Sequence, residues 1–170
     1  MKKILFFTLL AFATSVPCSL IAADKVMPET VAENLNGDEI RMPAELPGEH
    51  TLLLMAFQRE QQKNIDGWVA GMALRGSNIS WLELPVIENP GLLMRWFINW
   101  GMRRGIPGDD DRAHVASLYL DKTAFLSGFG ISDETAVYAA VVDQSGEVLT
   151  LVKGDYTPDA AKKIWQALAK

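Results

Sequence analysis

Few residues in the sequence have the type and spacing that catalysis or metal binding requires. Thiolate chemistry needs cysteine, and the 170-residue chain has only Cys18. The two histidines, His50 and His114, lie far apart with no spaced acidic or cysteine partners, so we expect both on the surface or in loops. The carboxylates of 109–112 could suit a hard cation, but this stretch lacks the glycine and twelfth-position glutamate of a calcium loop and is predicted to be solvated. We expect no metal site.

Enzyme motifs are absent as well. The chain has no Gly-x-Ser-x-Gly turn, no Gly-x-x-x-x-Gly-Lys loop and no Gly-x-Gly-x-x-Gly turn. A nicotinamide or flavin dehydrogenase would also need a longer chain. We therefore assign no catalytic residue and no cofactor.

The first 23 residues have the layout of a secretory signal peptide. Lys2 and Lys3 precede an apolar run from Ile4, and the small residues Ala22 and Ala23 come before the first acid. An uncleaved membrane anchor is the alternative, because twenty uncharged residues could just span a bilayer. A third alternative is lipid attachment at Cys18, which the residues before it fit poorly. We expect export to the periplasm or cell envelope, cleavage near Ala23, and a mature chain without cysteine.

The mature chain, residues 24–170, is predicted to form one domain. Its length of about 147 residues is enough to bury a core. Removing Lys2 and Lys3 leaves 14 basic against 21 acidic residues, a net charge near −7. Nucleic acid is therefore an unsuitable partner.

Apolar periodicity predicts the elements that follow. A polar lead-in, 24–46, contains a short hairpin around Asn36-Gly37-Asp38. Residues 51–57 form a continuous apolar run, typical of a central parallel strand. The remaining predictions are a helix at 58–74 ended by Gly76, a strand at 79–87, a helix from 89 to about 104, a strand at 115–120, a helical turn at 122–129, a hairpin of 136–142 with 147–152, and a closing helix opened by Thr157-Pro158.

This element order resembles the thioredoxin-like fold, in its peroxiredoxin and thiol-disulfide oxidoreductase branch. The resembling patterns are Gly37–Pro43, then Leu46-Pro-Gly48 before the strand to Phe57, and later Tyr138–Val148 with its aspartate and glycine turn. The resemblance implies an α/β fold, a mixed sheet of about five strands flanked by helices on both faces.

The resemblance does not extend to the chemistry. A nucleophilic cysteine would follow the first core strand at a helix start, but the stretch there is Gln58–Asn64. A cis-proline would precede the third core strand, but that position reads Glu134-Thr-Ala136. Arg59, Glu60 and Gln61 thus become candidate polar groups of the vacated cleft, and ordinary helix-start charges are the alternative interpretation.

A narrower resemblance is to the thioredoxin-like assembly factors of mitochondrial ATP synthase, the family numbered ten. Arg103-Arg-Gly-Ile-Pro107, His114 and Tyr138–Asp143 are similar to its motifs, whereas 148–152 lacks the family's basic and tryptophan residues. This resemblance implies a chaperone or assembly function for a hydrophobic client.

The segment Leu92–Arg104 is the most distinctive in the chain. On a helix, Arg95, Asn99 and Arg103 form one narrow polar stripe, and the rest of the circumference is mostly apolar. One interpretation buries the helix, with Trp96 and Trp100 in the core. The other makes it a surface for an apolar partner or for the membrane interface, with contacts from Trp96, Phe97, Trp100, Arg103 and Arg104.

Three functional hypotheses follow. The first is a redox-inactive thioredoxin-like protein of the cell envelope that binds a protein client, an apolar or membrane protein among the candidates. The second is a structural module in peripheral contact with the membrane. The third is an enzyme of unknown type that uses Arg59, Glu60 and His114 in the vacated cleft.

Overall fold

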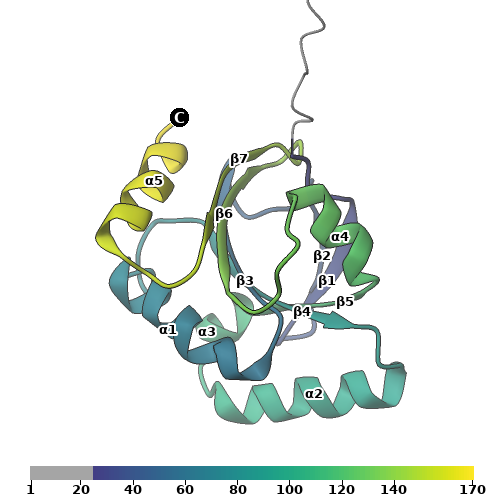
Figure 1. The fold of residues 1–170 in the computed structure, drawn as a ribbon. Helices are drawn as coiled ribbons and strands as arrows, with labels where there is room; N and C mark the ends of the chain where they lie inside the picture. Colours follow the sequence, from purple (N-terminus) through teal and green to yellow (C-terminus); the bar gives the residue numbers. More distant parts are fainter. Residues whose placement is uncertain (1–24) are drawn as a thin grey trace, which may run out of the picture.

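A mixed sheet of seven strands forms the centre of the described part of the protein (Figure 1). The computed structural model describes residues 25–170. The predictions for residues 1–24, including the signal peptide, Cys18 and the cleavage at Ala23, lie outside this range. The strand order is β2-β1-β5-β4-β3-β6-β7. The strands are β1 Thr30–Asn34, β2 Glu39–Met42, β3 His50–Ala56, β4 Trp81–Glu88, β5 Ala116–Leu120, β6 Tyr138–Asp143 and β7 Val148–Lys153.

Strand directions confirm the predicted mixed sheet. β3, β4 and β5 are parallel, and the remaining neighbours pair antiparallel. The predicted five strands become seven because the lead-in hairpin, β1–β2, joins the sheet beside β5. Gly37 makes that hairpin possible, since it adopts a φ of 97° that favours glycine.

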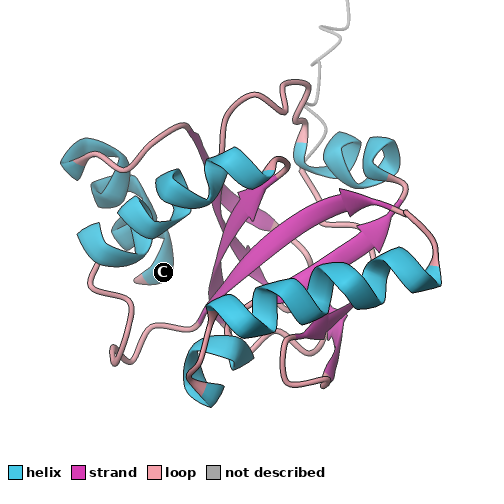
Figure 2. Cartoon of the chain, turned by 90° about the horizontal axis from the view of Figure 1, so that it is seen from below, coloured by secondary structure: helices cyan, strands magenta, loops and turns pink. Residues whose placement is uncertain are grey.

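Helices cover both faces of the sheet, as predicted. α1 and α5 lie on one face and α4 on the other (Figure 1). α2 lies apart from these layers, across the end of the sheet in Figure 2. The helices are α1 Gln62–Gly71, preceded by a short 3₁₀ turn η1 Arg59–Gln61, then α2 Leu92–Gly105, α3 Asp109–Ala113, α4 Lys122–Phe129 and α5 Pro158–Leu168.

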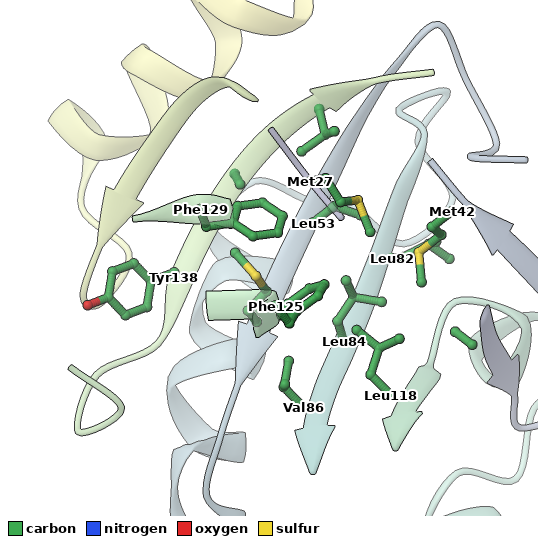
Figure 3. Close-up of a cluster of buried hydrophobic side chains, with 14 of the residues drawn as sticks. Met27, Met42, Leu53, Leu82, Leu84, Val86, Leu118, Phe125, Phe129 and Tyr138 are labelled. Carbon is green, nitrogen blue, oxygen red and sulfur yellow. The ribbon is translucent and has the colours of Figure 1, made fainter. Parts of the chain in front are cut away.

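The α4 face of the sheet holds the larger of two apolar clusters. Phe125 and Phe129 of α4 pack over β3, β4 and β5, and their rings lie 5.1 Å apart. Figure 3 shows both rings above side chains that alternate along β4, Leu82, Leu84 and Val86. The alternation sends the intervening β4 residues to the opposite face.

The opposite face is packed by α1 and α5. Trp68 is fully buried there, and its indole Nε1 donates to the Gly154 carbonyl at 3.0 Å. Thr157 caps α5 by accepting from the Ala160 N–H, as the Thr-Pro signal predicts. Ile164 of α5 completes this cluster.

Two local predictions are wrong. The first helix ends at Gly71 and not near Gly76, because Ala73 adopts a left-handed φ of 50° and the Leu74 N–H donates to the Val69 carbonyl at 2.9 Å. The acidic loop at 109–112 is largely the short helix α3. It forms because Arg112 pairs with Asp109 one turn earlier, while Asp111 pairs with Arg75 at 3.1 Å.

Candidate functional site

The polar stripe of α2 faces the protein. Arg95 Nη2 donates to the Tyr119 carbonyl at 3.1 Å, and the Tyr119 hydroxyl donates to Asn99 Oδ1 at 2.7 Å. At the end of the helix, Arg103 donates to the Leu35 carbonyl and pairs with Glu33 at 3.7 Å. The three side chains therefore attach α2 to β5 and to the N-terminal hairpin. Arg103, a predicted partner contact, serves within the chain.

The apolar residues of α2 consequently point outward. Within Leu92–Gly105 no side chain is buried, and Leu92, Trp96 and Trp100 are 84%, 59% and 47% exposed. The core interpretation of Trp96 and Trp100 is therefore wrong. It assumed that the apolar side of an amphipathic helix faces the sheet, whereas the polar stripe found hydrogen-bond partners there.

The exposed aromatic rings of α2 are ordered against one another. Trp96 lies 6.3 Å from Trp100 in a stacked arrangement and 5.1 Å from Phe97 in an edge-on one. The Arg104 guanidinium lies 4.7 Å from the Trp100 ring centre. We call the side chains of Leu92, Leu93, Trp96, Trp100 and Arg104 the outer face of α2. Phe97, which is 52% exposed, lies at its edge and also lines a cleft on the inner side of the helix.

A cleft of about 940 Å³ separates α2 from the α1 face of the sheet. α2 contributes an apolar wall with Phe97, Ile98 and Met102. The opposite wall comes from α1 and from the alternate residues of β4 that α4 does not cover: Gln62, Asp66, Val69, Trp81, Glu83, Pro85 and Ile87. A helix packed closely on β4 would have filled this space.

Glu83 is the buried ionisable group of the cleft. Its side chain is only 6% exposed, and burial raises the pKa of its carboxyl above the ordinary value. A hydrogen bond from Gln62 opposes this shift in pKa, the Asp66 charge adds to it, and the Arg75 charge opposes it. Arg75, however, is already paired with Asp111.

Gln61 lies in the segment where the resemblance would place a cysteine. Its side chain links two backbone segments, and we call this link the tie at Gln61. Its Oε1 accepts from the Phe57 N–H at 2.8 Å and from the Gln58 N–H at 3.3 Å, and its Nε2 donates to the Glu134 carbonyl at 2.8 Å. The buried amide thus joins the turn after β3 to the loop before β6. These are the two segments where the resemblance would place the cysteine and the cis-proline.

The other predicted polar groups are dispersed. Arg59 lines the cleft, whereas Glu60 is exposed and does not line it. His114 stacks on Trp81 with ring centres 4.3 Å apart, and its Nδ1 lies 2.9 Å from the Trp81 carbonyl oxygen. His50 lies at the start of β3, remote from these groups.

Two further observations concern residues 25–170. No group of three or more His, Cys, Asp or Glu side chains in this range could hold a metal ion. None of the helices in the same range is long and apolar enough to cross a membrane.

Solved structures with the same arrangement of elements are numerous. The pneumococcal exposed lipoprotein thioredoxin Etrx1 of Streptococcus pneumoniae strain TIGR4 is 17% identical, with 84% of this chain and 98% of that chain covered and a TM-score of 0.52. A thiol-disulfide oxidoreductase from Bacteroides fragilis is 13% identical, with 85% and 99% covered and a TM-score of 0.52. The fold is thioredoxin-like.

A third neighbour is described both by a disulfide switch and by its family of assembly proteins. BsSco, a member of the Sco family of cytochrome c oxidase assembly proteins, is 12% identical, with 86% and 94% covered and a TM-score of 0.57. No protein-family model and no curated protein matches the sequence. At these identities the likeness concerns the thioredoxin-like scaffold alone.

Sequence reasoning missed Glu83 and the tie at Gln61. For Glu83 a signal was present, because it is the one charged residue between apolar neighbours in Trp81–Ile87, and an acid inside a buried strand needs a reason. For Gln61 the local signal covers only the capping box that it forms with Gln58 at the start of η1. Its partner carbonyl, on Glu134, is 73 positions away.

Proposed function

We propose that this chain is a redox-inactive thioredoxin-like protein of the cell envelope that binds a protein client, in assembly or folding, through the outer face of α2. The observation that carries the proposal is the reversed orientation of α2. Its polar stripe is used for attachment, so its aromatic and aliphatic side chains are left for a partner. Tryptophan, methionine and arginine are enriched at protein interfaces.

The absence of redox chemistry in this proposal follows from the residues at the thiol position. A dithiol mechanism needs two cysteines, and the chain has one, in the N-terminal segment. Gln61 ties the two segments between which a substrate disulfide would react. In this proposal the thioredoxin-like scaffold positions a binding surface and carries out no redox reaction.

The envelope location and the kind of client are the remaining parts of the proposal. The first 23 residues resemble a signal peptide, and Etrx1 is, by name, an exposed lipoprotein. BsSco is, by name, a member of an assembly-protein family. Together with the resemblance of Arg103–Pro107 to ATP synthase assembly factors, these likenesses support an apolar subunit of a membrane complex as the client.

The test is crosslinking followed by affinity capture from the envelope fraction. A Trp96→Ala, Trp100→Ala variant removes the centre of the outer face, and Trp165→Ala is its matched control. Trp165 is likewise exposed, at 45%, but lies on α5. Wild type and the control should capture the same discrete partner, and the double variant should lose it. Equal capture by all three would refute the assignment to α2.

The membrane-interface hypothesis remains an alternative because Trp100 and Arg104 lie together on the outer face. Flotation with vesicles that contain anionic lipid distinguishes the two. The lipid surface is favoured over a protein client if two results are obtained together. The wild type floats with the vesicles whereas the double variant does not, and the crosslinking experiment captures no protein.

A further inference from the structure

The cleft under α2 combines an apolar wall with a buried carboxylate. Its volume of about 940 Å³ lies within the range of small-molecule sites, which are mostly apolar with a few placed polar groups. Phe97, Ile98 and Met102 supply the apolar wall, and Glu83 lies among the polar groups of the opposite side. This site is separate from the outer face of α2.

Glu83 lacks a cation of its own. Among residues 25–170 it forms no ion pair, and the groups that face the cleft are Asp66 from α1, Asp111 from α3, and the cations Arg59 and Arg75. Arg75 is paired with Asp111. The acidic side chains that remain in the cleft therefore outnumber the basic ones that remain. A buried carboxylate without a charge partner is unfavourable, and a bound cation would remove that penalty.

The neighbours of Glu83 limit the shape of that cation. Gln62 lies close enough to the Glu83 carboxyl to lower its pKa, and the Gln62 amide donates to Asp66 Oδ1 at 3.3 Å. The planar fork of a guanidinium needs two free, parallel acceptors, whereas a primary ammonium can use one. Across the cleft from Glu83 lies the apolar wall of α2, which suits an alkyl chain.

We propose that the cleft binds a primary alkylammonium group, with the ammonium on the Glu83 carboxylate and the alkyl chain along Phe97, Ile98 and Met102. The group can come from a free alkylamine or from a lysine side chain. Binding requires ionised Glu83, so affinity should rise with pH through the pKa of this carboxyl and then level off. Each added methylene should strengthen binding about fourfold while the chain still fits.

The experiment is calorimetric titration of the full chain with octylammonium, octanol and octanoate at pH 7.5. Octylammonium should bind at least tenfold more tightly than the other two. Equal affinity for octanol would overturn the proposal, because the site would then recognise the chain alone. An acetyl-Leu-Lys-Leu-amide peptide, compared with its norleucine analogue, tells a lysine source from a free amine. If neither octylammonium nor the lysine peptide binds, the proposal is also overturned.

Two variants locate the site. Glu83→Gln keeps the shape and removes the charge, and it should weaken octylammonium binding at least tenfold. Gly101→Leu should abolish binding by filling the cleft. Gly101 lines the cleft with nothing within 4 Å of an added Cβ, and leucine favours a helix more than glycine does. Full binding by both variants would refute the site.

The outer face serves as the control. The Trp96→Ala, Trp100→Ala variant should retain octylammonium binding, because those rings point away from the cleft. Loss of binding in this variant, with Glu83→Gln unaffected, would show that the amine adheres to the outer face and would overturn the proposal. Client capture by Gly101→Leu tests the proposed function separately.

Discussion

Gln61 satisfies three backbone groups with one side-chain amide. Two N–H groups after β3 donate to its oxygen, and its nitrogen donates to the Glu134 carbonyl. A buried backbone group without a partner costs about 1–3 kcal/mol. One side chain therefore maintains the geometry between the turn after β3 and the loop before β6.

Gln61→Ala is expected to lower the free energy of unfolding by about 2–4 kcal/mol. The Phe57 and Gln58 N–H groups lose their acceptor, and the Glu134 carbonyl keeps only the longer bond from Gln58 Nε2 at 3.4 Å. Gln61→Glu should be destabilising too, because a carboxylate keeps the acceptor but faces the Glu134 carbonyl with no donor. Urea denaturation measures both changes. Glu60→Gln, at the exposed neighbouring position, is the control. A loss of stability in Glu60→Gln as large as that in Gln61→Ala would contradict a specific role for the hydrogen bonds of Gln61.

Glu83 should make stability depend on pH. Its pKa is raised by burial in the folded state above the ordinary 4.5, so the folded protein binds the proton more tightly than the unfolded chain. The contribution of Glu83 to the free energy of unfolding is therefore fully present below pH 4.5. It is lost as the pH rises through the pKa of the folded state. Glu83→Gln should raise the melting temperature at pH 7, with a gain that shrinks toward pH 4. A gain of the same size at both pH values would contradict the raised pKa.

At the scale of elements, α2 is attached by polar contacts and not by apolar burial. The stabilisation from its aromatic residues is correspondingly small, because little of their surface is removed from water. Trp68 on α1 shows the opposite case. It is fully buried, lies 5.6 Å from the Tyr156 ring in an edge-on arrangement, and donates to the Gly154 carbonyl.

Replacing Trp96 and Trp100 together by alanine is expected to change the free energy of unfolding by less than about 1 kcal/mol. Trp68→Ala should cost about 3–5 kcal/mol, since it leaves a cavity and an unpaired carbonyl. Thermal and urea denaturation followed by circular dichroism compares the two. If the double variant unfolds as readily as Trp68→Ala, the Trp96 and Trp100 rings belong to the packed core.

The elements themselves were largely predictable because each depends on local periodicity and on turn residues. The run 51–57, the Asn36-Gly37-Asp38 turn and the Thr157-Pro158 start all lie where the pattern indicates. Which side of α2 faces the rest of the protein was not predictable. Periodicity identifies a polar stripe, but the partners that turned it inward, Tyr119 and Leu35, come from distant parts of the chain.

For the whole molecule, the scaffold was predictable and its added strands were not. The order of elements indicated a thioredoxin-like sheet, since short right-handed connections leave few alternatives. Whether the lead-in hairpin would join the sheet depended on its pairing with β5. Glu33 lies opposite Ser117 there, a relation that no local pattern encodes.

The stability of the 170-residue chain should not depend on thiol reductants. One cysteine cannot form an intramolecular disulfide, so no covalent cross-link contributes to its stability. We expect the same melting temperature with and without dithiothreitol, and no reduction of insulin disulfides above the uncatalysed rate. A shift of several degrees on reduction would point to an intermolecular disulfide through Cys18.

The strand order also decides when folding can finish. A chain that emerges N-terminus first can close the β1–β2 hairpin at once, but β3 needs β6 as a neighbour, and Thr51 pairs with Val142. Until about 140 residues are available, the most apolar strand therefore has one open edge, and long-range pairing of this kind is slow. The interval before β6 emerges is when this protein is most exposed to aggregation and most dependent on being held by others.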